Sequence, residues 1–341
     1  MKNFKSLLIS TILMTSPLLL TSCGGSGEKS RAPQLSESQK IIANGMLDFV
    51  DTCDSSKSNV KAIYGADNRV SVCSEGNDTE DREKMKAVAM FIDSSQLIFA
   101  GNLEGKKVYK IDSQTLGGFL SEESGYKACS SLRYKDEVAP GFCTGFLINE
   151  NGRNDELMTA GHCIDKGKLT NTKVIFTIAA DGRKVISRNE AYENDIFVTE
   201  DQVFGIQENL EFSSDMTIAK LDREVQNVEA LEISRKEYFQ DGTELKMMGH
   251  PAGLRMKVAI GEVKHDGYGN DKITAHIASY GGNSGSPVFD EETGEVAGVL
   301  VSGQQDFELQ IENDEYCVGD KVYSEFDAGG EKVLKVRNYL N

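Results

Sequence analysis

The chain of 341 residues contains no tryptophan and only four histidines. So few histidines exclude a histidine-rich metal site, and neither a CxxC nor an HExxH spacing is present to supply a zinc site. The chain also lacks a basic patch, since 54 acidic residues face 37 basic ones and give a formal charge of −17. We therefore expect no nucleic-acid partner, no metal and no cofactor.

A hydrophobic run long enough to span a membrane is missing too. The apolar stretch from Leu7 to Leu20 follows Lys2 and Lys5 and ends abruptly, which is typical of a signal peptide. The stretch ends in Leu20-Thr21-Ser22-Cys23-Gly24, which resembles the lipobox of bacterial lipoproteins. The resemblance implies removal of residues 1–22 and a lipid on the Cys23 thiol. An ordinary signal peptide with an incidental cysteine is the alternative.

The remaining chain divides into three parts. Residues 23–35 have almost nothing to bury and are expected to form a flexible tether. Residues 36–59 are expected to be a helical extension, because Ser36-Glu37-Ser38-Gln39 fits a capping box and apolar residues follow at helical spacing as far as Val50. Residues 60–341 then form the main domain, for which we expect a monomer. The acidic excess is expected to keep an exported protein soluble.

The main domain has the pattern of an all-β protein. From about residue 105 onward, short apolar stretches alternate with turns rich in Gly, Asn and Asp, which is typical of a sandwich or barrel. Helices are expected at 81–92 and 331–340. The expected strands include Gly145–Ile148, Leu157–Ala160, Val174–Thr177, Thr217–Leu221, Leu245–Met248, Val258–Val263, Ile273–Ile277, Pro287–Phe289 and Val296–Val301.

Apart from Cys23, six of the seven cysteines remain. An even number in an exported chain favours disulfides over metal ligands or free thiols. Spacing alone leaves many pairings open. The six are Cys53, Cys73, Cys129, Cys143, Cys163 and Cys317.

Three motifs indicate nucleophilic chemistry. The segment Gly281–Pro287 (GGNSGSP) places Ser284 in a sharp glycine turn, where backbone N–H groups are free to receive a negatively charged oxygen. Upstream, Thr159-Ala160-Gly161-His162-Cys163 offers a base, and Asp215 opens an apolar stretch. A serine, a histidine and a carboxylate are the groups that serine-based acyl transfer needs.

The order of these groups excludes one competing fold. An α/β-hydrolase needs glycine at the position of Ser286 and arranges its triad as Ser, Asp, His, whereas this chain has the order His, Asp, Ser. Asp195 and Asp222 are rivals to Asp215, although neither opens an apolar strand.

Several segments resemble the chymotrypsin/trypsin-like serine peptidases. Gly141–Ile148 and Met158–Cys163 look like that family's Cys-x-Gly-x-Leu-Ile strand and its Thr-Ala-x-His-Cys motif. Asp215–Leu221 is similar to the strand that carries the orienting aspartate, and Gly282–Pro287 resembles the bacterial nucleophile loop. Lys61–Val70 is similar to the start of mature glutamyl-endopeptidase-like members. The resemblance implies two six-stranded antiparallel β-barrels with the catalytic residues in the crevice between them.

The resemblance also implies roles. Ser284 is the expected nucleophile, His162 the general base and Asp215 the residue that orients His162, with the N–H groups of Gly282 and Ser284 as the oxyanion hole. It implies a Cys143–Cys163 bridge beside the histidine. Proximity in the sequence favours a Cys53–Cys73 bridge, which leaves Cys129 and Cys317.

One departure from the family pattern is Asn283. The trypsin-like zymogens have an aspartate there, which pairs with a newly freed N-terminus and so forms the oxyanion hole. Asparagine cannot form that ion pair. We therefore expect a hole that is preformed or ordered by other contacts.

The alignment predicts the specificity pocket. There is no acid at Ala278 to select Arg or Lys, and no histidine at Leu300 or Val301 to select Glu, while His276 lies nearby in sequence. We expect an uncharged P1 side chain, small to medium and apolar. The expected base of the pocket is Ala278, Ser279 and Tyr280, and its wall is Val301, Ser302 and Gly303.

The sequence thus predicts a lipid-anchored serine endopeptidase of the bacterial cell envelope, with protein or peptide substrates. The alternative is a binding lipoprotein on the same fold whose catalysis has decayed, and a non-peptide acyl hydrolase is a third option. The turn Gly249–Gly253 looks like a cleft-edge loop, although a plain hairpin turn fits it better than substrate contact.

Overall fold

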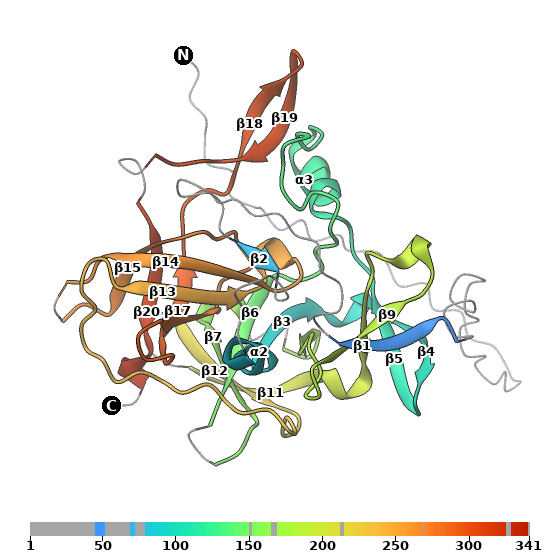
Figure 1. The fold of residues 1–341 in the computed structure, drawn as a ribbon, viewed down its shortest axis with the longest axis horizontal. Coiled ribbons are helices and arrows are strands. Elements are labelled where there is room, and N and C mark those ends of the chain that lie inside the picture. The colour runs from blue at the N-terminus through green and yellow to red at the C-terminus, as the bar shows by residue number, and fades with distance from the viewer. Residues whose placement is uncertain are drawn as a thin grey trace, which may run out of the picture. The chain divides into compact units, whose positions relative to one another are not determined.

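Two closed six-stranded antiparallel β-barrels make up the centre of the computed structural model (Figure 1), as predicted. The model describes residues 45–51, 69–71, 79–149, 152–164, 169–211, 215–267, 269–324 and 329–339. They belong to one compact unit, residues 37–341. No helix in these described ranges is long and apolar enough to cross a bilayer.

The first barrel has the strand order β11-β12-β7-β6-β3-β8. Strands β3 and β6 are apolar along almost their whole length because both faces are covered. The strands are β3 (Val88–Asp93), β6 (Cys143–Ile148), β7 (Glu156–Ala160), β8 (Thr172–Ile175), β11 (Val203–Glu211) and β12 (Met216–Leu221).

The second barrel has the order β13-β16-β17-β20-β15-β14 and is closed by pairing between β13 and β14. The two-residue strand β2 (Val70–Ser71) is added to the edge of β14. One apolar core includes Phe146 of the first barrel and Phe289 of the second. The strands are β13 (Glu244–Gly249), β14 (Lys257–His265), β15 (Lys272–Ile277), β16 (Pro287–Asp290), β17 (Val296–Ser302) and β20 (Glu331–Lys335).

Two further β structures lie outside the barrels (Figure 1). A five-stranded sheet has the order β1-β9-β10-β5-β4, and the hairpin β18–β19 projects beside helix α3 (Leu116–Ser124). The Cys129–Cys317 disulfide joins the segment after α3 to β19. The strands are β1 (Leu47–Asp51), β4 (Leu97–Leu103), β5 (Lys106–Ile111), β9 (Arg183–Ser187), β10 (Ile196–Thr199), β18 (Phe307–Glu312) and β19 (Glu315–Asp320).

The three helix predictions need correction. Helix α2 spans only Thr79–Lys86, and Val88–Asp93 forms a strand because its apolar residues are buried between β6 and β8. Near the C-terminus, Glu331–Lys335 is a barrel strand between β15 and β17, followed by a 3₁₀ turn at Val336–Tyr339. In both places, pairing with distant strands overrides a local helical pattern.

The expected N-terminal helical extension is contradicted where it is described. Leu47–Asp51 is a strand that pairs with β9, with Leu47 opposite Ser187. Its apolar residues bury one face against the sheet instead of forming a helical stripe. The rest of that extension, together with Cys53 and Cys73, lies outside the described residues.

Candidate active site

His162 and Asp215 are brought together by the pairing of two strands. His162 lies in the 3₁₀ turn Gly161–Cys163 directly after β7, and Asp215 lies directly before β12. These strands pair with Met216 opposite Ala160, so the two side chains start from neighbouring positions. The N–H of Gly161 also donates to the carbonyl of Asp215 at 3.0 Å. The register of β7 and β12 thus fixes the pair.

The Asp215 carboxylate holds both the backbone and the ring of His162. Its Oδ1 accepts the His162 N–H at 2.9 Å, and His162 Nδ1 lies 3.1 and 3.0 Å from Oδ1 and Oδ2. An ionised carboxylate only accepts hydrogen bonds, so Nδ1 carries the proton. The Nε2 lone pair of neutral His162 is then available as a base. The His162 side chain is 48% exposed.

The rival carboxylates have other partners. Asp222 accepts the Gly205 N–H at 2.9 Å and pairs with Arg223, while Asp195 pairs with Lys110 at 2.6 Å. Asp215 is therefore the carboxylate that the structure pairs with His162.

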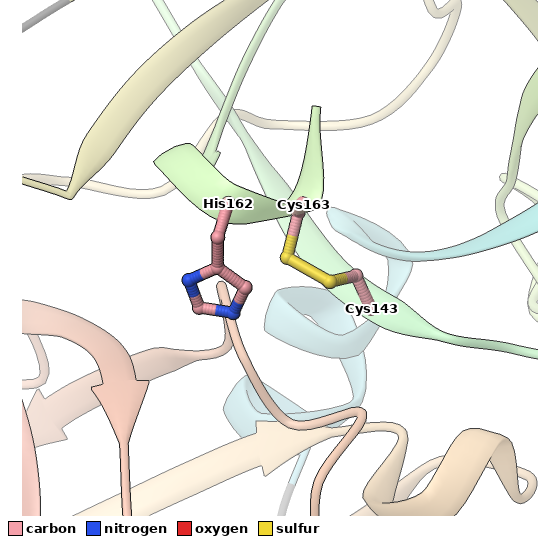
Figure 2. A group of neighbouring side chains, drawn as sticks. All are labelled: Cys143, His162 and Cys163. Carbon is pink, nitrogen blue, oxygen red and sulfur yellow. A yellow bond between two sulfur atoms is a disulfide. The ribbon is translucent and has the colours of Figure 1, made fainter. Parts of the chain in front are cut away.

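The Cys143–Cys163 disulfide lies beside His162 (Figure 2). The sulfur of Cys163 is 3.5 Å from the carbonyl oxygen of Ser284, so the loop that carries the serine packs against this corner of the first barrel. Among the described residues, the Ser284 hydroxyl makes no hydrogen bond to His162. Such bonds are often long or poorly aligned before a substrate binds.

The same corner offers no metal site. Ligand atoms of Cys143, His162 and Cys163 lie within 4.8 Å of one another. The two sulfurs are bonded to each other, so neither is the thiolate that zinc requires.

Thr144 of β6 attaches the nucleophile loop, residues Gly281–Pro287, to the first barrel. The Thr144 N–H donates to the Ser284 carbonyl at 2.9 Å, and its hydroxyl donates to the Gly282 carbonyl at 2.9 Å. The hydroxyl also accepts the His250 N–H at 3.0 Å. Thr144 is fully buried, so water does not compete for these bonds. It links the loop to the 249–253 turn.

The backbone at Gly282 requires glycine. Its φ is +91°, and a β-carbon there would lie 2.8 Å from the Gly253 nitrogen and from the His250 carbonyl. The Gly281 carbonyl points toward Ala252, whose N–H it accepts. In the trans peptide between Gly281 and Gly282 the C=O and N–H point in opposite directions, so the Gly282 N–H points away from Ala252. No acceptor among the described residues receives the N–H of Gly282 or Ser284. These two groups are free to bind an oxyanion.

Asn283 is buried, with an exposed fraction of 1%. Its amide nitrogen donates to Ser279 Oγ at 3.1 Å, and its amide oxygen accepts from Ser286 Oγ at 3.3 Å. Both partners are neutral hydroxyls. The side chain that differs from the zymogen pattern is thus satisfied without an ion pair.

The turn Gly249–Gly253 supports the nucleophile loop. His250 is fully buried, and its Nδ1 hydrogen-bonds the Leu254 carbonyl at 3.0 Å. Burial lowers the pKa of His250 to about 4, so the ring is neutral and Nδ1–H is the donor. The turn joins the paired strands β13 and β14, with Gly249 opposite Lys257.

The expected pocket residues fall into two groups. Ala278, Ser279, Tyr280 and Val301 are buried, whereas Ser302 and Gly303 are exposed. Ser279 and Tyr280 border a partly open space that has room for about one water molecule. The other residues around this space are Gln304, Gln305, Asp306, Lys321, Tyr323 and Glu331.

Two acidic residues that border this space, Asp306 and Glu331, were not predicted from the sequence. A β-carbon on Gly303 would collide with the Glu331 carboxylate, so Glu331 fills the room that the glycine leaves. Asp306 accepts the Gly281 N–H at 2.7 Å, and burial raises the pKa of its carboxyl to about 6. Neither acid lies in a motif, and each comes from a distant strand or connection. No local signal marks them.

A scan against protein-family models matches residues 143–299 to the trypsin-like peptidase domain. This range contains His162, Asp215 and Ser284. Comparison with curated protein sequences gives no significant match.

Several solved structures are similar to this chain. Rv3671c from Mycobacterium tuberculosis, in an inactive mutant form, is 14% identical with a TM-score of 0.40, over 77% of this chain and 88% of that one. A Glu endopeptidase in complex with MPD is 16% identical with a TM-score of 0.41, over 77% and 95%. The VesB protease of Vibrio cholerae is 11% identical with a TM-score of 0.41, over 75% and 62%.

The two barrels and the domain match together define the class of the molecule. Residues 143–299 match the trypsin-like peptidase domain, the chain has the two-barrel fold of that class, and this fold supports a peptidase function.

Proposed function

We propose that this protein is an exported serine endopeptidase that cleaves peptide bonds through His162, Asp215 and Ser284. The observation that carries the proposal is the double hydrogen bond of Asp215 to His162, beside a glycine loop with two free N–H groups. A base held in one tautomer and a preformed oxyanion site are the two parts that serine-based acyl transfer requires.

The reaction then proceeds in two halves. Ser284 Oγ attacks the scissile carbonyl carbon while His162 Nε2 takes the hydroxyl proton, and Asp215 stabilises the imidazolium that forms. The N–H groups of Gly282 and Ser284 receive the oxyanion. His162 returns the proton to the leaving amine, which leaves an acyl-enzyme. Water, deprotonated by the same histidine, releases the acid and restores Ser284.

The substrate is proposed to be a protein or peptide with an uncharged, small-to-medium apolar P1 side chain. The support is the sequence pattern, which has no acid at Ala278 to select Arg or Lys and no histidine at Leu300 or Val301 to select Glu. A cleavage profile on a peptide library tests this, and dominance of Arg, Lys or Glu at P1 would refute it.

The protein is also proposed to reach the bacterial cell envelope as a lipoprotein anchored through Cys23. The support is the lipobox-like segment that ends the apolar stretch. Each methylene buried in the membrane would contribute about 0.8 kcal/mol to anchoring.

Covalent labelling tests the catalytic proposal. A fluorophosphonate probe should label the wild-type protein and the Ser95→Ala variant, whose exposed serine lies in the remote 3₁₀ turn Ser94–Gln96. It should not label Ser284→Ala. Asp215→Asn should label about 10⁴-fold more slowly, because the tautomer of His162 is no longer fixed.

The same proteins separate the competing functions. Absence of labelling from the wild type would favour the decayed binding lipoprotein, whereas labelling that survives in Ser284→Ala would reject Ser284 as the nucleophile. Turnover of esters without cleavage of casein or a peptide library would favour a non-peptide acyl hydrolase.

A further inference from the structure

Arg69 is a fully buried cation directly before β2 (Val70–Ser71), the short strand that pairs with β14 of the second barrel. Its carbonyl oxygen accepts hydrogen bonds from Arg133 Nη2 at 2.7 Å and from the Tyr134 hydroxyl at 3.1 Å. Strand β2, which follows it, pairs with β14. Removing a guanidinium from water is costly, so the groups around its side chain must stabilise it.

The Arg69 guanidinium stacks on the residue that precedes the nucleophile loop. Its Cζ lies 3.7 Å from the ring centroid of Tyr280, a close cation–π contact. The Tyr280 hydroxyl donates to Asp320, and its carbonyl accepts the Asn283 N–H at 3.1 Å. Tyr280 is therefore held at its ring, its hydroxyl and its backbone. Its backbone contact reaches directly into the loop.

The charge of Arg69 also acts on the carboxylate that holds the next residue. Asp306 accepts the Gly281 N–H at 2.7 Å, and a charged acceptor makes the stronger bond. Burial raises the pKa of Asp306, whereas the positive charge of Arg69 lowers it. The titratable groups that act on Asp306 by charge or border its space are Arg69, Tyr280, Asp320, Lys321, Tyr323 and Glu331.

These contacts fix the peptide that forms the oxyanion site. Asp306 holds the Gly281 N–H, and the Ala252 N–H holds the Gly281 carbonyl. With both ends of Gly281 bonded, the Gly282 N–H has one direction available, away from Ala252. A shift of Tyr280 or Asp306 would rotate this peptide.

We propose that Arg69 is a positioning residue, the internal cation that holds Tyr280 and Asp306 and so sets the oxyanion hole. The proposal rests on the peptidase function proposed above. It accounts for the neutral Asn283, because the loop is ordered from the Tyr280 side by a cation within the chain. The hole then depends on the docked segment Arg69–Ser71 and needs no new N-terminus.

The test compares Arg69→Met, which keeps bulk and removes charge, with Arg69→Lys, which keeps charge and removes the planar stack. Arg69→Met should lower kcat and kcat/KM together by roughly 10- to 100-fold with KM nearly unchanged, because a misplacement of about 1 Å at the reacting groups costs up to about 100-fold. Arg69→Lys should fall between Arg69→Met and the wild type.

Arg223→Met is the matched control. Arg223 stacks on Phe204 with its Cζ 3.9 Å from the ring centroid, at the end of β12 remote from the nucleophile loop. It should lose stability without losing labelling rate. Thermal unfolding of each variant shows that the protein assayed is folded.

The pH profile separates positioning from simple loss of stability. Without Arg69 the pKa of Asp306 rises further, so the acid limb of the labelling rate in Arg69→Met should move to higher pH. In an Asp306→Asn background the Arg69 substitution should no longer move that limb.

Two results would overturn the proposal. One is equal labelling rates in Arg69→Met and Arg223→Met, with wild-type labelling still dependent on Ser284; the other is an acid limb that Arg69→Met leaves unmoved. Absence of Ser284-dependent labelling from the wild type would instead reject the peptidase function itself.

Discussion

At the scale of single residues, two buried neutral side chains, Asn283 and His250, lie beside the candidate active site. Asn283 makes two bonds to hydroxyls where the resemblance implies an ion pair in related zymogens. His250 is neutral, and its own backbone N–H makes the contact between the 249–253 turn and Thr144. Neutrality avoids the cost of burying an unpaired charge next to the oxyanion site.

His250 makes stability depend on pH in a defined window. Its pKa is lowered from 6.5 to about 4 in the folded protein, so its contribution is fully present above pH 6.5 and is lost as pH falls toward 4. Between pH 7 and 4 the wild type should lose up to roughly 3 kcal/mol of unfolding free energy through this residue. His250→Gln should lose less over the same range, as measured by urea unfolding. Equal losses in both proteins would contradict the prediction.

At the scale of elements, strand β6 and the nucleophile loop join the two barrels at Thr144. The hydroxyl of Thr144 bonds the Gly282 carbonyl and the His250 N–H, and no other side chain in the described ranges is hydrogen-bonded to the Gly282 carbonyl. The loop is therefore ordered by a strand of the opposite barrel.

Thr144→Val keeps the shape of the side chain and removes its hydroxyl. It should cost about 1–3 kcal/mol of stability, because two buried backbone groups lose a partner. It should also lower the fluorophosphonate labelling rate, since the Gly282 peptide is released. Thr199→Val is the control, since Thr199 is buried in the five-stranded sheet and its hydroxyl bonds Gln202. A Thr144→Val variant that labels as fast as Thr199→Val would contradict this role.

The sequence predicted those elements whose pattern is local. Val174, Ile218 and Ile273 lie in expected strands, because short apolar stretches between turns are typical of barrels. The expected helix over 331–340 failed because Val333 and its neighbours gain more from two strand partners than from a helical face. Such pairing depends on residues far away in the chain.

The candidate site shows the same difference between residues in local motifs and residues that only the fold brings together. His162, Asp215 and Ser284 were expected because each lies in a short motif with a chemical reason for its residue types. Arg69, Thr144 and Asp306 were not expected to support the loop. They come from three distant segments, and only the fold brings them to Tyr280, Gly282 and Gly281.

At the scale of the whole molecule, the proposed lipid anchor would determine where the protein acts. Mass spectrometry of membrane-extracted protein should find a chain that begins at Cys23 and carries added acyl mass. Cys23→Ser should move the protein from the membrane fraction to the soluble fraction with its labelling rate intact. An unmodified chain that is soluble in the wild type would show an ordinary signal peptide instead.

The attachment at Thr144 has a mechanical consequence. His162 follows a strand of the first barrel and Ser284 lies on a loop of the second, so the rate of turnover should depend on the spacing between the two barrels. A small loosening of the contact between the barrels would abolish activity while the strands of each barrel remained paired. A bound peptide that contacts both barrels would stabilise the spacing between them. The substrate would thereby favour the arrangement of groups that cleaves it.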